Sequence, residues 1–384
     1  FNALATAPDG KSLNDMVDPG PSLLPSLAGM LLRFREYKSA LQADIRKAFF
    51  MVAVNPEDRP YLRFLWPGRS DSDELLTWRL TKLPFGVNCS PYMLTAVIHH
   101  HLKELRALSA PKERDRIDLL LTSFYVDDLV SSVSNASEAK EMQEFSVRVL
   151  TDAGMELRKW RGSEIPCDPE AGDKVLGLKW KTSDDLLSIA ALGESDRPSV
   201  WTRRSLLKCV ASVFDPLGLA APAVVPGKIL LQQAWKVGGD WDDKLPDGIA
   251  AACAQWWGEL AEVVSIDIPR WICCNLDTPI ALHAFADASE KAFGCCLYAV
   301  VNGQSHLVFA KAKVAPVSPP TLARLELQAV CLAARYAEFV VKELRVTVTQ
   351  VYGWTDSLTT VHWISNPSYK WKTFVANRVS QVQE

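Results

Sequence analysis

Apolar residues follow two different periods along the first half of the chain. A spacing of three to four residues predicts amphipathic helices at 23–32, 90–107 and 135–153. Alternating apolar residues predict strands at 62–66, 76–80, 176–180 and 186–190, and a strand that passes into a short turn or helix at 39–55. The polar loop Gly68–Glu74 would join two of these strands as a hairpin. Two further apolar runs, Leu119–Phe124 and Leu129–Val133, predict a second hairpin whose tip carries Tyr125-Val126-Asp127-Asp128.

The second half of the chain changes from a helical pattern to an alternation of strands and helices. Residues 200–265 have mostly helical spacing and are interrupted by Asp215-Pro216-Leu217-Gly218. From about residue 278 we expect three strands, a helix, a strand and a helix, at 281–286, 294–301, 307–310, 325–342, 346–354 and 357–364. This order of elements predicts one α/β domain.

Composition and charge narrow the class of protein. The 384 residues are 48% hydrophobic and 23% charged, which fits a globular protein of two or three domains. The net charge of −3 does not by itself indicate a nucleic-acid partner. The most basic stretch, 197–236, has a local charge of +5, which we interpret as a helical surface that follows a duplex backbone; an ordinary basic surface is the alternative. Its charged residues are Arg197, Arg203, Arg204, Lys208, Lys228 and Lys236 against Asp215, with Trp201 and Trp235 near its ends.

Cysteine usage and the absence of long apolar segments indicate an intracellular protein. None of the nine cysteines forms a C-x-x-C pair, which favours free thiols over a disulfide framework or a zinc site. The most apolar stretch, Leu217 to Leu231, contains Pro222, Pro226 and Lys228. We therefore expect no signal peptide, no membrane span and no membrane partner.

A group of acidic residues in the first half suggests metal chemistry. Asp127 and Asp128 are adjacent at the tip of the predicted hairpin, and Asp44 lies at the end of another predicted strand. Adjacent carboxylates repel each other when partly enclosed, and a divalent cation such as Mg²⁺ or Mn²⁺ removes that penalty. Two such ions could activate a 3′-hydroxyl and stabilise a leaving pyrophosphate. An Asp-Asp pair is also common in solvated turns, which is the alternative for the pair taken alone.

Three segments resemble the palm motifs of reverse transcriptases in order and spacing. They are Asp44-Ile45-Arg46-Lys47-Ala48-Phe49-Phe50, Leu83-Pro84-Phe85-Gly86-Val87-Asn88-Cys89-Ser90-Pro91 and Tyr125-Val126-Asp127-Asp128. Other segments are similar to the BEL/Pao class of long-terminal-repeat retrotransposons, so that the resemblance covers essentially the whole chain. They are Leu32-Arg33-Phe34-Arg35, Leu62-Arg63-Phe64-Leu65-Trp66, Leu157-Arg158-Lys159-Trp160 and Phe214-Asp215-Pro216-Leu217-Gly218.

The resemblance implies roles for individual residues of the first half. The implied catalytic metal ligands are Asp44, Asp127 and Asp128, and the implied substrate-binding residues are Phe49, Phe85, Gly86 and Lys159. Phe49 would lie under the incoming sugar and exclude a 2′-hydroxyl, although a core aromatic is the alternative. Phe85 and Gly86 would lie near the nascent base pair, and Lys159 is a candidate for contact with phosphate.

A second ordered group of acids resembles the catalytic layout of ribonuclease H. Asp287 ends a predicted strand, Glu326 begins a predicted helix and Asp356 ends the next predicted strand. The resemblance implies that all three are catalytic and hold two metal ions that activate water against an RNA phosphodiester. The family's fourth acid follows an Asn-Pro-Ala-Asp-like segment, which we expect beyond Glu384.

The predicted fold class is α/β (α+β), with a right-hand polymerase palm and a ribonuclease H-like domain. The expected domains are partial fingers and palm at 1–190, a helical thumb or connection at 191–275, and a C-terminally truncated ribonuclease H-like domain at 276–384. The implied activity is RNA-directed DNA polymerase with ribonuclease H acting on RNA–DNA hybrids. The implied partners are an RNA template, a DNA primer, the RNA–DNA hybrid, dNTPs, and the peptidase and integrase domains of the same Pol polyprotein. We expect the protein in cytoplasmic virus-like particles and in the nucleus.

Two other functions remain open from the sequence. In the family, basic finger residues that hold the triphosphate precede the position of Phe1, so we expect weak activity from this segment by itself. A decayed or domesticated copy that binds nucleic acid without catalysis is therefore the main alternative. The six acids favour the enzyme, because unselected carboxylates drift. A module that only binds other proteins would not require them in this order.

Overall fold

The structure is a computed structural model in which the chain forms two compact units. It describes residues 2–68, 75–189, 197–264, 266–274, 279–318 and 320–384. Unit 1 comprises Phe1–Ser26, Ala40–Ser131 and Ala136–Gly172, and unit 2 comprises Leu27–Ser39, Ser132–Asn135 and Asp173–Glu384. The expected domain boundaries at 190 and 275, and residues 69–74 of the expected hairpin loop, lie outside the described residues.

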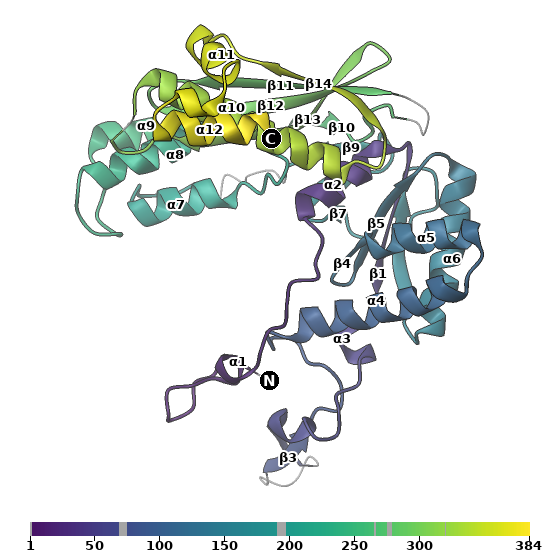
Figure 1. The fold of residues 1–384 in the computed structure, drawn as a ribbon. Coiled ribbons are helices and arrows are strands. Elements are labelled where there is room, and N and C mark those ends of the chain that lie inside the picture. Colours follow the sequence, from purple (N-terminus) through teal and green to yellow (C-terminus); the bar gives the residue numbers. More distant parts are fainter. Residues whose placement is uncertain (1, 69–74, 190–196, 265, 275–278, 319) are drawn as a thin grey trace. The chain divides into compact units, whose positions relative to one another are not determined.

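Unit 1 is built on a four-stranded sheet with the order β4-β5-β1-β6 (Figure 1). The strands are β1 (Ser39–Ile45), β4 (Phe124–Tyr125), β5 (Asp128–Val133) and β6 (Leu157–Gly162). The helices are α1 (Leu13–Met16), α3 (Ala48–Met51), α4 (Ser90–Leu108), α5 (Pro111–Leu121) and α6 (Ala136–Asp152). Helices α4 and α6 confirm the predicted amphipathic helices, since apolar residues such as Leu94, Leu102 and Phe145 are buried. A hairpin of β2 (Arg63–Pro67) and β3 (Leu75–Arg79), preceded by the 3-10 helix Arg59–Tyr61, is also as predicted.

The first strand of the predicted acidic hairpin is much shorter than expected. Residues Leu119–Leu121 belong to helix α5, and only Phe124 and Tyr125 pair as a strand with β5. Pro111 lies in the first turn of this helix, where a missing N–H costs nothing. The prediction of a strand from Leu119 was wrong because Ile117 and Leu120, both buried, have the three-residue spacing of a helix face.

Unit 2 contains a second small sheet with the order β10-β9-β8-β7 and three helices. These elements are β7 (Lys174–Val175), β8 (Leu178–Lys181), β9 (Leu186–Ser188), β10 (Ile268–Pro269), α7 (Arg203–Ser212), α8 (Ala221–Lys236) and α9 (Asp247–Val264). Leu176 and Gly177 have positive φ and form the turn between β7 and β8, so the strand expected from residue 176 begins at Leu178. The helices share a core that includes Leu206, Trp256 and Leu260.

Part of the basic stretch 197–236, which was interpreted as a helical surface that follows a duplex backbone, has structural contacts. Arg203 is only 3% exposed, and its guanidinium donates to the carbonyl oxygens of Ala234 (3.0 Å), Gly238 and Gly239. Arg204 forms an ion pair with Asp242 at 2.7 Å. Helix ends leave carbonyl groups without partners, and Arg203 satisfies such groups at the end of α8. The charge of this arginine therefore serves the fold.

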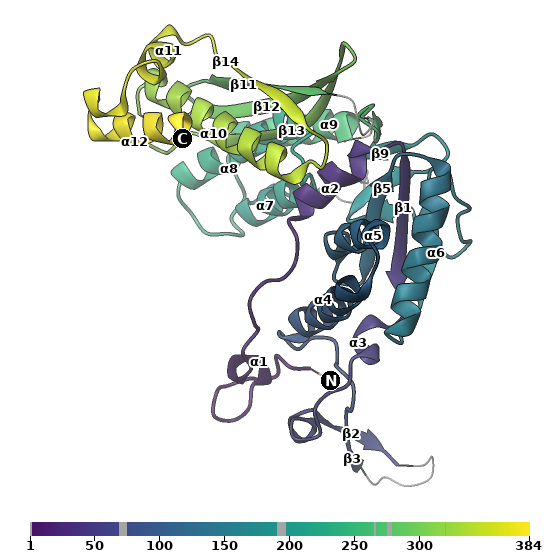
Figure 2. The ribbon, with the colours of Figure 1, turned by 45° about the vertical axis from the view of Figure 1, so that its right-hand side comes forward.

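The C-terminal part of unit 2 is an α/β domain whose sheet has the order β13-β12-β11-β14 (Figures 1 and 2). Its elements are β11 (Ile280–Ala288), β12 (Ala292–Val301), β13 (Gln304–Val314), α10 (Leu322–Glu343), β14 (Val348–Trp354), α11 (Leu358–Ile364), the 3-10 helix Ser368–Lys370 and α12 (Thr373–Gln383). Strands β11 to β13 are antiparallel neighbours, and β14 pairs parallel with β11. Helix α10 packs on β11 and β12, and α12 packs on α10. The predicted order of strands and helices is confirmed.

Buried charges hold the end of α2 (Leu27–Glu36) within unit 2. The side chain of Glu36 is fully buried and accepts hydrogen bonds from Arg345 Nε (2.7 Å) and the Val346 amide (2.9 Å). The buried guanidinium of Arg270 donates to the carbonyl of Phe34 at 2.6 Å and to both carboxylate oxygens of Asp185. Buried charges are tolerated when they are paired in this way. The helix begins at Leu27, later than predicted, since Pro21 and Pro25 disfavour helix before it.

No helix among the described residues has the length and apolarity needed to cross a bilayer.

Candidate active sites

Strands β5 and β1 bring the three acids of the first half to the same part of the sheet in unit 1. Asp128 begins β5, Asp127 precedes it in the hairpin loop, and Asp44 lies one residue before the end of β1, the neighbour of β5. The Ile45 amide donates to the carbonyl oxygen of Asp127 at 2.9 Å. This bond fastens the hairpin loop to β1 directly beside Asp44.

The hairpin loop stores backbone strain next to these acids. Tyr125 pairs with Asp128, which leaves Val126 and Asp127 as a two-residue turn. Val126 has φ of 57°, in the left-handed region that β-branched residues rarely adopt. Such a conformation costs on the order of 1–3 kcal/mol and persists only where the surroundings impose it. The bond from Ile45 to the Asp127 carbonyl is one such constraint.

The electrostatics of the group disfavour three ionised carboxylates. The pKa of Asp128 is raised to about 6, first by burial and then by the neighbouring charges of Asp127 and Asp44, while Lys159 opposes them. Burial also raises the pKa of Asp127, with Asp44 contributing in the same direction. Desolvated acids of like charge have this behaviour, and a bound cation relieves it.

Two cations of β6 already neutralise Asp44. Arg158 Nε lies 3.1 Å and Lys159 Nζ 3.9 Å from the same oxygen of Asp44, and Arg158 is its cross-strand partner. Lys159 has φ of 54°, a further backbone irregularity at this site. The structure thus places the predicted phosphate contact, Lys159, beside the acids. Arg158 was not singled out from the sequence, although its place next to Lys159 was a signal.

The predicted substrate-contacting residues of unit 1 form an aromatic cluster. Phe49 is 8% exposed and its ring meets that of Phe85 edge-to-face, with centroids 4.8 Å apart. Phe85 is 55% exposed and also contacts Phe50. Gly86 has φ of 87°, which explains glycine at this position. Its carbonyl accepts a hydrogen bond of 2.9 Å from Asn14.

The three acids of the second half converge in unit 2. One carboxylate oxygen from each of Asp287, Glu326 and Asp356 lies within 4.8 Å of the others, and within the described parts of the chain no other such group of metal-ligand side chains occurs. Asp287 lies near the end of β11, and Asp356 follows β14, its parallel neighbour. Carboxyl ends of parallel strands meet at one end of a sheet, which explains the convergence. Glu326 enters from the second turn of α10.

The burial and the hydrogen bonding of Glu326 are those expected of a metal ligand. It is 7% exposed, and its Oε2 atom is buried without a hydrogen-bond partner. Burial raises its pKa, and the charges of Asp287 and Asp356 add to that effect. A buried oxygen without a partner is costly, and coordination of a hard divalent cation would satisfy it. The residues present therefore fit a hard divalent cation.

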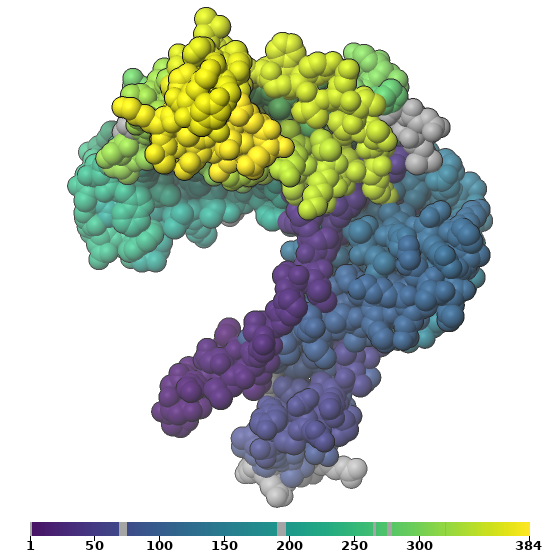
Figure 3. Space-filling model, in the orientation of Figure 1, coloured from purple at the N-terminus to yellow at the C-terminus, as the bar shows by residue number. Residues whose placement is uncertain are grey.

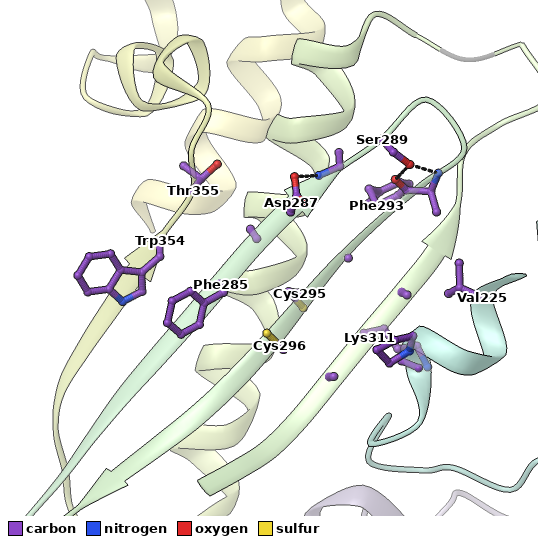
Figure 4. A pocket seen from close by; sticks show the side chains of 18 of the residues that line it. Val225, Phe285, Asp287, Ser289, Phe293, Cys295, Cys296, Lys311, Trp354 and Thr355 are labelled. Atoms are coloured by element: carbon purple, nitrogen blue, oxygen red, sulfur yellow. Dashed lines mark hydrogen bonds between the residues drawn. The ribbon is translucent and has the colours of Figure 1, made fainter. Parts of the chain in front are cut away.

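A cavity of about 690 Å³ adjoins this acidic group (Figure 4). Asp287 and Asp356 line it together with the small residues Gly294, Cys296, Ala310 and Ala312 and with Pro222 and Val225 of α8. Phe285 and Trp354 also line it, with nearly parallel rings whose centroids are 6.0 Å apart. These two aromatics were missed from the sequence. Each precedes a predicted acid by two residues, and this shared spacing places both rings on one face of parallel strands.

Comparison with known proteins finds one family match in each of two parts of the chain. Residues 4–160 match the family described as reverse transcriptase (RNA-dependent DNA polymerase). Residues 202–357 match the family described as Pao retrotransposon-like RNaseH-like domain. These segments contain all six acids of the two groups.

The curated relatives that the chain matches are retroviral polyproteins much longer than itself. The Pol polyprotein of equine infectious anemia virus (strain Wyoming) is 26% identical over 179 residues, which cover 45% of this chain and 14% of the relative. The Gag-Pol polyprotein of gibbon ape leukemia virus is 29% identical over 113 residues, which cover 29% of this chain and 6% of the relative.

Similar solved structures confirm the predicted fold class. The foamy viral protease-reverse transcriptase dRH in complex with double-stranded DNA has a TM-score of 0.62 at 16% identity, over 99% of this chain and 62% of that one. The foamy viral protease-reverse transcriptase in complex with an RNA/DNA hybrid has a TM-score of 0.61 at 15% identity, over 97% and 46%. At these identities the likeness shows the fold.

Proposed function

We propose that this chain is part of the Pol polyprotein of a Pao-type retrotransposon, and that its reverse transcriptase-like and ribonuclease H-like parts copy RNA into DNA and cleave RNA in the hybrid. The observation that carries the proposal is the convergence of Asp287, Glu326 and Asp356 within 4.8 Å around a buried oxygen that has no partner. The proposed nucleic-acid partners agree with the foamy viral structures, which hold double-stranded DNA and an RNA/DNA hybrid.

In unit 1, Asp44, Asp127 and Asp128 would hold the metal ions of DNA synthesis. When bound, Mg²⁺ or Mn²⁺ supplies the positive charge that activates a 3′-hydroxyl and stabilises the leaving pyrophosphate. Asp128 would give up its proton to bind metal, because its raised pKa leaves a fraction protonated in the metal-free site near neutral pH. Lys159, released from Asp44, would then be free to contact phosphate oxygens. Phe49 would pack against the sugar and exclude a 2′-hydroxyl.

In unit 2, Asp287, Glu326 and Asp356 would hold the metal ions of RNA cleavage. The backbone of β11 and α10 fixes the ligands, so little reorganisation accompanies binding. Asp287 and Asp356 are exposed and would contact a substrate that approaches from solvent, whereas Glu326 is buried and would bind the metal from the protein side. Ions at this position would activate water against the RNA phosphodiester.

Paired substitutions test whether the two groups carry two separate activities. We expect Asp287→Asn to lower cleavage of an RNA–DNA hybrid at least about 100-fold and to spare DNA synthesis. Asp127→Asn should lower DNA synthesis by a similar factor and spare cleavage of the hybrid. Both reactions are measured on the full chain with Mg²⁺ and with Mn²⁺, using a labelled RNA strand for cleavage and a labelled primer for synthesis.

The controls are exposed acids outside the two groups. Glu290 lies three residues from Asp287, and Asp152 is the last residue of helix α6 in unit 1. The substitutions Glu290→Gln and Asp152→Asn should both leave the two activities unchanged. If Asp287→Asn cleaves the hybrid as well as Glu290→Gln does, the assignment of the second group is wrong. Binding of hybrid without either reaction, in wild type and variants alike, would favour the alternative of a non-catalytic nucleic-acid-binding protein.

A further inference from the structure

The N-terminal segment of unit 1 holds the loop that follows Leu83. Figure 3 shows the N-terminal residues (purple) as an arm at the surface of unit 1, and Figure 1 places α1 within this arm. The side-chain amide of Asn14, in α1, donates to the carbonyl oxygen of Gly86 at 2.9 Å, and its Oδ1 atom accepts a hydrogen bond of 3.0 Å from the backbone amide of Asn88. In return, Asn88 Nδ2 donates to the backbone carbonyl of Asn14 at 2.8 Å and to that of Val17 at 3.1 Å. Two segments far apart in the sequence are therefore joined by reciprocal asparagine bonds.

Helix α1 is itself fixed to unit 1, so the side chain of Asn14 has a defined place. Ser12 and Asp15 form a capping box at the start of the helix, with hydrogen bonds of 2.8 Å and 3.3 Å between side chain and backbone. Val17, just after the helix, packs against the apolar cluster that contains the buried Val87, a residue of the same loop. A side chain carried by a fixed element can position the group that it binds.

Gly86 by itself would not fix the direction of the chain at Phe85. Its φ of 87° is a conformation that glycine adopts readily, but glycine adopts many others as well. The hydrogen bond from Asn14 selects one of them. On the other side of Phe85, the carbonyl oxygen of Pro84 accepts a hydrogen bond of 2.7 Å from the hydroxyl of Ser90, which is buried. Phe85 therefore lies between two carbonyl groups that are each held by a side chain.

The position of Phe85 decides what surrounds the ring of Phe49. Phe85 is exposed, whereas Phe49 is buried, and the two rings meet edge-to-face with centroids 4.8 Å apart. A shift of the loop would move the ring of Phe85 away and open space beside Phe49. Interiors are close-packed, so a displacement of even about 1 Å changes which groups fit against a side chain.

We propose that Asn14 is a positioning residue for the selection of deoxyribonucleotides, because it holds Phe85 against Phe49 through the carbonyl of Gly86. The inference rests on the proposed DNA synthesis, in which Phe49 excludes a 2′-hydroxyl. Asn14 acts through the loop and touches neither the triphosphate nor the metal ions. Its loss therefore changes the choice between the two kinds of nucleotide more than the rate of synthesis.

The test is primer extension on an RNA template by the full chain with the substitution Asn14→Asp. An aspartate keeps the acceptor for the Asn88 amide, whereas its second oxygen cannot donate to the Gly86 carbonyl and repels it. We measure kcat and KM for a deoxyribonucleoside triphosphate and for the matching ribonucleoside triphosphate. The variant should use the ribonucleotide roughly three- to tenfold better relative to the deoxyribonucleotide, which is the effect of one hydrogen bond.

The matched control is Asn55→Asp. Asn55 lies in an exposed loop of unit 1, and its Oδ1 atom likewise accepts a hydrogen bond from a backbone amide, that of Glu57, at 3.4 Å. This substitution makes the same chemical change away from the loop after Leu83. It should keep the wild-type ratio of ribonucleotide to deoxyribonucleotide use.

Two further variants show whether Asn14 acts through the contact of Phe85 with Phe49. In a chain that already carries Phe49→Val, Asn14→Asp should raise the ratio no further, since both changes act on one contact. Phe85→Ala alters an exposed side chain and should raise the ratio as Asn14→Asp does, so it decides the matter if Asn14→Asp does not fold. A general folding defect lowers the use of both nucleotides alike and leaves their ratio unchanged.

The possible results separate this inference from the proposed function. An unchanged ratio in the folded Asn14→Asp variant overturns the inference, as does a rise that adds to that of Phe49→Val. A wild-type chain that extends no primer refutes the proposed DNA synthesis itself, and this inference with it.

Discussion

Replacing Asp128 by asparagine should stabilise the metal-free protein at neutral pH. Burial and the charges of Asp127 and Asp44 raise the pKa of Asp128 from 3.8 to about 6 in the folded state. Between about pH 4 and pH 6 the unfolded chain therefore loses this proton while the folded chain keeps it, and the free energy of unfolding falls as pH rises. The difference corresponds to about 3 kcal/mol, which we reduce to about 1–2 kcal/mol because the side chain is partly exposed. Asparagine has no charge to desolvate, so the free energy of unfolding of the variant does not fall in this pH range.

The assay is chemical denaturation of wild type and Asp128→Asn at several pH values with a chelator present. The variant should match wild type near pH 4 and exceed it by about 1–2 kcal/mol at pH 7.5, while Asp152→Asn, an exposed control, shows no such trend. Adding Mg²⁺ should raise the stability of wild type more than that of Asp128→Asn, which retains only the second acidic group, since binding to the folded state shifts unfolding. A difference that does not change with pH, or a variant less stable at pH 7.5, would refute the reasoning.

Three further predictions concern packing, buried charge and substrate choice. Gly218→Ala should lower the free energy of unfolding by about 2–4 kcal/mol, because a Cβ at this position would overlap the carbonyl oxygen of Ala310 and because φ of Gly218 is 74°. Denaturant-induced unfolding measures this loss, and an unchanged midpoint would contradict the close contact of Gly218 with Ala310. Glu36→Gln should cost about 3–5 kcal/mol by leaving Arg345 without its buried partner, and a thermal melt equal to wild type would argue against that pairing. Phe49→Val should raise incorporation of ribonucleotides relative to deoxyribonucleotides at least about tenfold in primer extension; an unchanged ratio would leave Phe49 as a core aromatic.

Local patterns were sufficient for most elements of the fold. The three strands from residue 280, helix α10 and strand β14 follow the alternation and helical spacing of their own residues. The run from Leu119 was misread because a short apolar stretch is compatible with either a strand or the buried end of a helix. The turn at Pro111, eight residues earlier, decides that case in favour of α5.

The sequence by itself indicated which acids belong together. Resemblance to palm motifs grouped Asp44, Asp127 and Asp128, and resemblance to the strand, helix and strand order of ribonuclease H grouped Asp287, Glu326 and Asp356. Only the tertiary structure decided what surrounds them. Arg158 lies next to Asp44 because β6 pairs with β1, and a cross-strand neighbour cannot be read from either strand alone. Arg203 contributes to the basic stretch in sequence, yet the fold buries it against the carbonyls that follow α8. Local propensity and periodicity are properties of adjacent residues, whereas the partner of a charge depends on which distant segments the fold brings into contact.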